Sequence, residues 1–216
     1  GLSRPDRTLP PLGDSWATQI ASGVIPSVAR WLGLTWADEE QLAGGITPPF
    51  KAWPPPGGEV WGGYYVMRNG WTDRANYLLI DGGAWGLSHM HCDRLSIVVS
   101  ALGRNFLVDP NKTIYQSNEP GAFISMLNAG FLHNTVTVDG VDEFIRPPGW
   151  WETERPLDNR WESGDGYTLF CGRFDFKPVK DVVWERRALF VGGVYWLLQD
   201  ILTGAPGTIM VEQNFQ

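Results

Sequence analysis

Only three histidines occur in this chain of 216 residues, and two of them lie two positions apart. His89 and His91 stand in the stretch HMHCD, which ends at Asp93, and His133 stands in HNTVTVD. Side chains alternate along an extended segment, so we expect His89, His91 and Asp93 on one face. Imidazole and carboxylate groups together suit a metal site or an acid–base site. The alternative is a pair of partly buried histidines held by ordinary hydrogen bonds.

A metal shared between this segment and a neighbouring strand places a demand on the backbone. The stretch LSIVVSALGRNFLVDP predicts two strands that turn near Leu102-Gly103, with Asp109 opposite about Ser96. A straight strand at ~3.3 Å per residue would carry His91 roughly 16 Å past that point. Zinc needs its donors within ~2.0–2.2 Å. If His91 and Asp109 share an ion, the segment must therefore curl back over the sheet, and Asp93 would fix the bend by accepting backbone N–H bonds.

The elements that must position these residues are mostly strands. From about residue 60, apolar alternation and Asn-Gly, Gly-Gly and Asp-Gly turn signals predict strands without a long helical pattern between them. This pattern predicts a mainly antiparallel β-sandwich. Apolar stripes between residues 14 and 43 predict short helices. We therefore expect a linker with short helices over 1–58, ending a preceding helical domain, and a sandwich over 59–216 that is truncated at its C-terminus.

Composition excludes several classes of protein. A net charge of −7 argues against a nucleic-acid surface, and no apolar run approaches membrane-spanning length. Two cysteines, Cys92 and Cys171, are too few for a disulfide framework. The chain opens on Gly1 with neither a Met nor a signal peptide, and it ends in VEQNFQ, so we expect a piece of a longer protein.

An ordered set of motifs resembles heparinase II/III-like polysaccharide lyases. From about Gly62 to about Leu202 the set comprises GGYYVMRNGW, LLIDGG, HMHCD, LSIVVSALGRNFLVDP, HNTVTVDG and VYWLLQDIL. LPPLGDS, at residues 9–15, resembles the exit from the helical toroid that precedes this domain in the family. The resemblance implies a β-sandwich packed against an α/α toroid of the same protein, with an acidic polysaccharide between them. It also implies β-elimination on uronate units, in the periplasm or outside the cell.

The resemblance further implies roles for single residues. His91, Asp109 and His133 match the family's metal ligands and would hold Zn²⁺ as a structural or site-organising ion, with no organic cofactor. His89 matches a residue at the catalytic cleft. Tyr115, in NKTIYQSNEP, either serves catalysis there or simply packs its ring with the hydroxyl in water.

Substrate binding is less well defined by the motifs. Arg94 and Arg146 are candidates for the substrate carboxylate, and the alternative for each is a solvated surface charge. The chain departs from the family at Asn111, where a glycine often follows Asp-Pro, and in GAFISMLNAGF, which lacks the usual arginine.

Two other kinds of protein fit parts of the pattern. A non-catalytic carbohydrate-binding or pseudo-enzyme module would use Trp150, Trp151 and Trp161 as sugar-stacking faces. A cupin-like metal barrel also uses H-x-H on strands. It normally adds a glutamate a few residues later, whereas the nearest acid here is Asp93.

Overall fold

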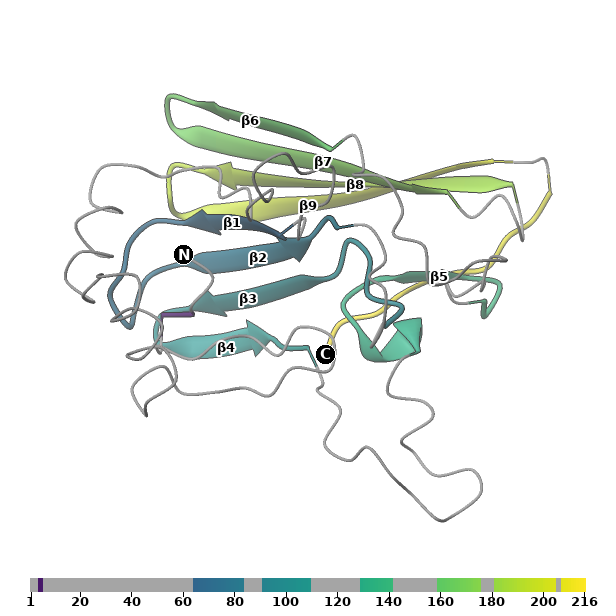
Figure 1. Ribbon diagram of the computed structural model, residues 1–216, viewed down its shortest axis with the longest axis horizontal. Coiled ribbons are helices and arrows are strands. Elements are labelled where there is room, and N and C mark those ends of the chain that lie inside the picture. The colour runs from purple at the N-terminus through teal and green to yellow at the C-terminus, as the bar shows by residue number, and fades with distance from the viewer. Residues whose placement is uncertain are drawn as a thin grey trace, which may run out of the picture.

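The computed structural model consists of two stacked antiparallel sheets and a small ribbon (Figure 1). It describes residues 4–5, 64–83, 91–109, 129–141, 159–175, 181–204 and 207–216. One sheet has the strand order β1-β2-β3-β4, the other has the order β6-β7-β8-β9, and β5 pairs with β10. All these pairs are antiparallel. The expected mainly antiparallel β-sandwich is therefore confirmed.

The strands of the first sheet are short and two strands of the second are long. The first sheet contains β1 (Tyr64–Arg68), β2 (Tyr77–Asp81), β3 (Ile97–Ala101) and β4 (Arg104–Leu107). The second sheet contains β6 (Arg160–Gly164), β7 (Tyr167–Asp175), β8 (Val182–Val191) and β9 (Tyr195–Gly204). A single turn of 3-10 helix, η3 (Gly130–Leu132), precedes β5 (Val136–Val138), whose partner is β10 (Val211–Gln213).

Alternation and turn chemistry explain why this sequence forms hairpins. In β8, residues of VVWERRALFV alternate between buried and more exposed positions, which is the period of a strand with one face on a core. The β3–β4 hairpin turns through Leu102 and Gly103, with φ values of 54° and 79°. Two positive φ angles are what a two-residue type I′ turn requires. The turn predicted at Leu102-Gly103 is confirmed.

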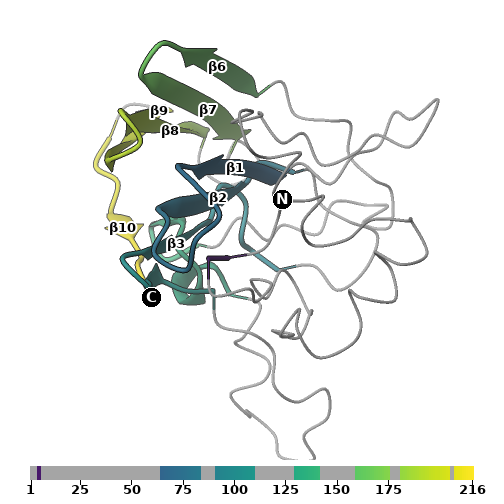
Figure 2. The same ribbon diagram turned by 90° about the vertical axis from the view of Figure 1, so that its left-hand side faces the viewer.

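The core lies between the two sheets. Figure 2, turned by 90°, again shows β6 to β9 above β1 to β3. Tyr65 of β1 packs on Phe170 of β7 with ring centroids 4.7 Å apart, and Trp184 of β8 is fully buried. Val136 and Val138 of β5 join the same core, so the segment that follows His133 is anchored between the layers. Burial of such side chains stabilises a fold by about 1.5–3 kcal/mol each.

Two expectations from the sequence, the N-terminal helices and the cupin-like barrel, are compared with the described residues. The short helices expected between residues 14 and 43 lie outside them, as does the rest of the 1–58 segment apart from Arg4 and Pro5. Within the described part, each four-stranded sheet is a meander of consecutive strands and lacks the Greek-key order of a cupin jelly roll, which argues against the cupin-like alternative. The same part of the chain contains no helix long and apolar enough to cross a membrane.

Candidate metal centre

His91 and Asp93 are presented by a tight turn that leads into β3. The Ser96 amide donates to the Asp93 carbonyl at 2.9 Å, and Leu95, between them, has a φ of 56°. A leucine with positive φ is strained, so tertiary contacts must hold it. Leu95 is fully buried, and its amide donates to the Asp81 carbonyl at 2.6 Å. The chain thus bends before β3, as a shared metal site would require.

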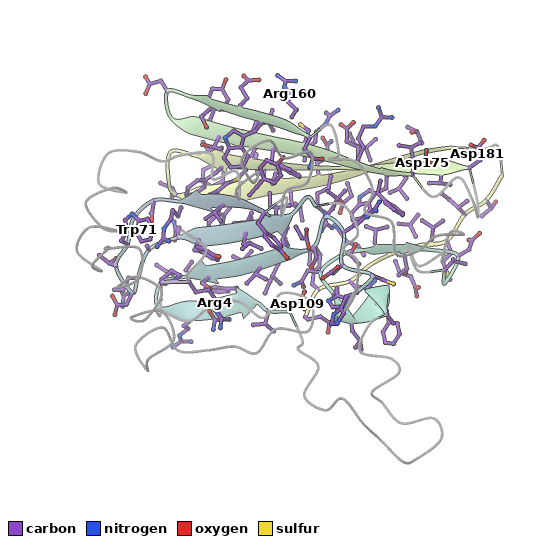
Figure 3. The ribbon with its side chains drawn as sticks, viewed as in Figure 1. Arg4, Trp71, Asp109, Arg160, Asp175 and Asp181 are labelled. Atoms are coloured by element: carbon purple, nitrogen blue, oxygen red, sulfur yellow. The ribbon has the colours of Figure 1, made fainter. Side chains whose placement is uncertain are left out.

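His133 and Asp109 come from two other segments and meet directly. His133 follows η3, and its backbone amide donates to the Gly130 carbonyl at 3.0 Å. Asp109 follows β4, and Figure 3 shows it at the end of that strand, next to η3. His133 Nδ1 lies 3.0 Å and 3.1 Å from the two carboxylate oxygens of Asp109. The contact is buried, with His133 0% exposed.

Three acid and base side chains converge at this point, and a fourth adjoins them. His91, Asp93 and His133 offer donor atoms that all lie within 4.8 Å of one another, and the two imidazole rings are 5.2 Å apart. Asp109 adjoins the group through His133. A tetrahedral ion with bonds of ~2.1 Å holds its donors about 3.4 Å apart, so the three donors, now within 4.8 Å of one another, would move closer together on binding. The nitrogen and oxygen donors fit a zinc-like cation.

The electrostatics of the cluster favour a bound cation. Burial raises the pKa of Asp93; the nearby Asp109 charge adds to this rise, while His133 and His91 oppose it. The pKa of Tyr64 is also raised, first by the charge of Asp81, then by burial, then by Asp93 and Asp109. Carboxyl groups are therefore placed close together in a space with little water, where their ionised forms repel each other. A divalent cation would offset that charge.

Asn134 and Thr135, directly after His133, hold the contributing segments together. The side-chain Nδ2 of Asn134 donates to the backbone carbonyls of Ile97 and Val108 at 2.7 and 2.8 Å. The Thr135 hydroxyl donates to the Arg94 carbonyl at 3.0 Å. These bonds join the stretch after Asp93, the end of β4 and the His133 segment. Sequence reasoning treated HNT as a motif but did not anticipate these roles, because every partner is distant along the chain.

Asp93 is the member of the cluster that sequence reasoning assigned differently. We expected its carboxylate to fix the bend, and its backbone carbonyl does accept the turn's hydrogen bond. Its side chain, however, belongs to the candidate metal group. The sequence already contained a signal for this role of Asp93, since the alternation in H-x-H-x-D places Asp93 on the same face as His91.

The remaining predicted site residues have different outcomes. His89, Tyr115 and Arg146 lie outside the described residues. Arg94 is 7% exposed and its guanidinium lies 5.2 Å from the centre of the Phe174 ring, so it is not a solvated surface charge.

The sugar-stacking alternative receives little support from its one described tryptophan. Trp161 stacks on Tyr65 with ring centroids 5.4 Å apart and packs against the core. Trp150 and Trp151 lie outside the described residues.

Comparisons with known proteins relate the chain to one family. A family model described as heparinase II/III-like, C-terminal, matches residues 59–213. A curated relative, the heparin-sulfate lyase of Pedobacter heparinus, is 25% identical over 222 residues, covering 98% of this chain and 31% of that protein.

Solved structures share the fold. Heparan sulfate lyase HepC from Pedobacter heparinus has a TM-score of 0.70 at 23% identity, over 96% of this chain and 32% of the other. A heparinase III structure has a TM-score of 0.68 at 19% identity, over 96% of this chain and 33% of the other. The chain thus spans about a third of the length of these relatives. The family model covers more than half of the chain, and the chain therefore belongs to the heparinase II/III-like family, in its C-terminal region.

Proposed function

We propose that this chain forms the metal-bearing wall of the substrate cleft in a polysaccharide lyase that cleaves uronate-containing acidic polysaccharides. The observation that carries the proposal is the buried convergence of His91, Asp93 and His133, with Asp109 against His133. Its family membership supports the reaction class. Relatives named as heparin-sulfate and heparan sulfate lyases make a sulfated uronic polysaccharide the first substrate to test.

We further propose that His91, Asp109 and His133 hold Zn²⁺, with Asp93 beside them. A bound ion would supply charge neutralisation and tie together segments that the fold brings from three places. Replacing Asp109 or Asp93 with Asn should each weaken Zn²⁺ binding by about 10–100-fold if both carboxylates serve the ion. Zn²⁺ affinity, measured by competition with a chromogenic chelator, separates a ligand from a bystander.

β-Elimination on a uronate requires three functions of the protein. The substrate carboxylate must be neutralised, a base must remove the C5 proton, and an acid must protonate the leaving oxygen as the C4–O bond breaks. The electrons of the C5–H bond form the new C4–C5 double bond. We assign proton transfer to His89 and Tyr115, and carboxylate binding to Arg146 and Arg94. We place further acid–base partners on an α/α toroid domain of the same protein.

The same function predicts where the protein acts. Polymeric acidic polysaccharides lie outside the cytoplasm, so we propose a periplasmic or extracellular location. Fractionation of the native host and detection of the protein by antibody would test that location.

A panel assay of the full-length protein tests the lyase function. The panel contains heparan sulfate, heparin, alginate and a neutral polysaccharide, and the readout is ultraviolet absorbance of the unsaturated uronate product. We expect turnover of one acidic substrate, none of the neutral control, and loss of turnover in His89→Ala. Tight binding of an acidic polysaccharide without new absorbance would instead indicate the non-catalytic module.

A further inference from the structure

We propose that Arg186 of β8 is a positioning residue for the metal centre, where it fixes the Asp93 turn relative to the His133 segment. The inference rests on the proposed metal centre. It concerns a residue of the second sheet, across the sandwich from β3, which follows Asp93, and β4, which leads to Asp109.

The guanidinium of Arg186 reaches both segments of the centre. Its Nη1 donates to the Leu95 carbonyl at 2.8 Å and to the Asn134 carbonyl at 2.5 Å. Leu95 lies in the turn that carries Asp93, and Asn134 directly follows His133. One nitrogen therefore spans two segments whose side chains converge at the centre.

The rest of the guanidinium is fixed from the opposite side by Asp200 of β9. The Nε and Nη2 of Arg186 donate to the two carboxylate oxygens of Asp200 at 2.8 and 2.9 Å. The two residues are cross-strand partners, and their pairing is bidentate. Asp200 also accepts hydrogen bonds from Trp184 and Gln213. Arg186 is 0% exposed, so the guanidinium has one orientation and its Nη1 points in one direction.

Burial makes a purely stabilising role a weak explanation for this pair. Removing two charges from water costs free energy that their attraction often only balances. The arginine is nonetheless placed where it can bond two carbonyls that β-sheet pairing leaves available. We therefore infer that Arg186 mainly fixes the position of the Leu95 turn relative to the His133 segment.

Gly172 of β7 gives independent support, because it clears the space in which the turn docks. It is the cross-strand partner of Arg186, and a Cβ at Gly172 would lie 2.4 Å from Cδ2 of Leu95. Gly172 thus leaves room for the side chain of Leu95, and the guanidinium of Arg186 bonds the carbonyl of the same residue. The second sheet is shaped at this point to receive the turn that leads to Asp93.

Lysine cannot replace arginine in this arrangement. A single ammonium keeps the charge but cannot hold both Asp200 oxygens in a planar fork while bonding two carbonyls. Arg186→Lys therefore separates geometry from charge. Arg187→Lys is the matched control, since Arg187 adjoins it on β8 but faces solvent and pairs with Glu185.

The test measures metal binding on the folded, full-length protein. Zn²⁺ affinity is obtained by chelator competition, and the visible spectrum of bound Co²⁺ reports ligand geometry. Circular dichroism verifies folding at the working temperature. We expect Arg186→Lys to weaken Zn²⁺ binding at least about tenfold and to change the Co²⁺ spectrum, with Arg187→Lys within about twofold of wild type.

Wild-type affinity and an unchanged Co²⁺ spectrum in a folded Arg186→Lys variant would overturn the inference, even if the melting temperature falls. If that variant does not fold, Asp200→Asn decides by the same two readouts, because it removes the charge that orients the guanidinium. Wild-type protein that binds no Zn²⁺ would overturn the metal centre itself. Binding that is lost in His91→Ala but unaffected by Arg186→Lys and Asp200→Asn would overturn only the role of Arg186.

Discussion

At the scale of single residues, two histidines in one short motif are proposed to do different work. His91 is buried and its ring lies 5.2 Å from that of His133. We therefore expect His91→Ala to lose the metal and its stabilisation, on the order of 4 kcal/mol at a thousandfold excess over Kd. His89→Ala should keep the metal and lose only turnover. Elemental analysis and thermal unfolding, with and without chelator, measure both variants.

An equal loss of metal in His89→Ala and His91→Ala would contradict this division of roles. His89 would then be a ligand, and another group would have to act in the cleft. Retention of metal in His91→Ala would remove His91 from the site altogether.

Asp200 gives the fold a dependence on pH with a definite sign. Burial alone would raise the pKa of Asp200, but hydrogen bonds and charge from Arg186 lower it overall. A carboxyl with a lowered folded pKa stabilises the protein above its unfolded value of about 3.9 and loses this effect as pH falls through the folded pKa. We expect Asp200→Asn to cost about 3–5 kcal/mol at neutral pH, and the deficit to shrink at lower pH, below about pH 4.

Denaturant unfolding of metal-free protein at several pH values measures this deficit. Asp165→Asn is a suitable control, because Asp165 is exposed in an Asp-Gly turn that accepts asparagine equally well. A deficit that stays constant down to pH 3 would contradict the assigned direction of the Asp200 pKa.

At the scale of elements, the β3–β4 hairpin contains a leucine in a left-handed backbone conformation, and a substitution could relieve this strain. Leu102 has a φ of 54° and is 62% exposed, so it bears backbone strain and buries little apolar surface. Asparagine before Gly103 would give the preferred type I′ pair. Because a left-handed backbone costs most residues about 1–2 kcal/mol and asparagine less, we expect Leu102→Asn to stabilise the protein by about 1 kcal/mol in thermal unfolding. Leu102→Val, which is β-branched at the same φ, should destabilise it.

The hairpin also shows what sequence alone can predict. Its turn was predictable because the signal is local, in Leu102-Gly103 between two apolar strands. The pairing was predicted less well: extending the observed Val99–Leu107 pair by two residues places Asp109 opposite Ile97, one residue from the prediction. The difference coincides with a register shift between Val99 and Ser100, which no local pattern in the sequence specifies.

Long-range contacts explain the rest of what was missed. Arg94 was expected either at a substrate or in solvent; its burial against Phe174, 80 positions along the chain, excludes only the solvated alternative. The role of Arg186 is not visible in its local sequence, because its partners Leu95 and Asn134 lie 91 and 52 positions away. A signal did exist: the alternation in VVWERRALFV places Arg186 on the inner face with Trp184, where an arginine is unusual.

At the scale of the whole molecule, the described fold is proposed to supply one wall of a substrate cleft. The chain spans about a third of its relatives' length, and the proposed toroid would supply the opposite wall. Its net charge of −7 would also repel an anionic polymer, so local positive groups must overcome this repulsion at the site.

The last prediction is that the 216-residue chain, produced alone, binds Zn²⁺ but cleaves little or no polysaccharide. The metal groups reside within its own sandwich, whereas holding a substrate between two positioned walls can supply about 7–11 kcal/mol of the barrier reduction in the best intramolecular models. Paired measurements of Zn²⁺ stoichiometry and unsaturated-product formation, on the isolated chain and the full-length protein, test this. Robust turnover by the isolated chain would place every essential acid and base among these 216 residues, and the search for them would begin with His89 and Tyr115.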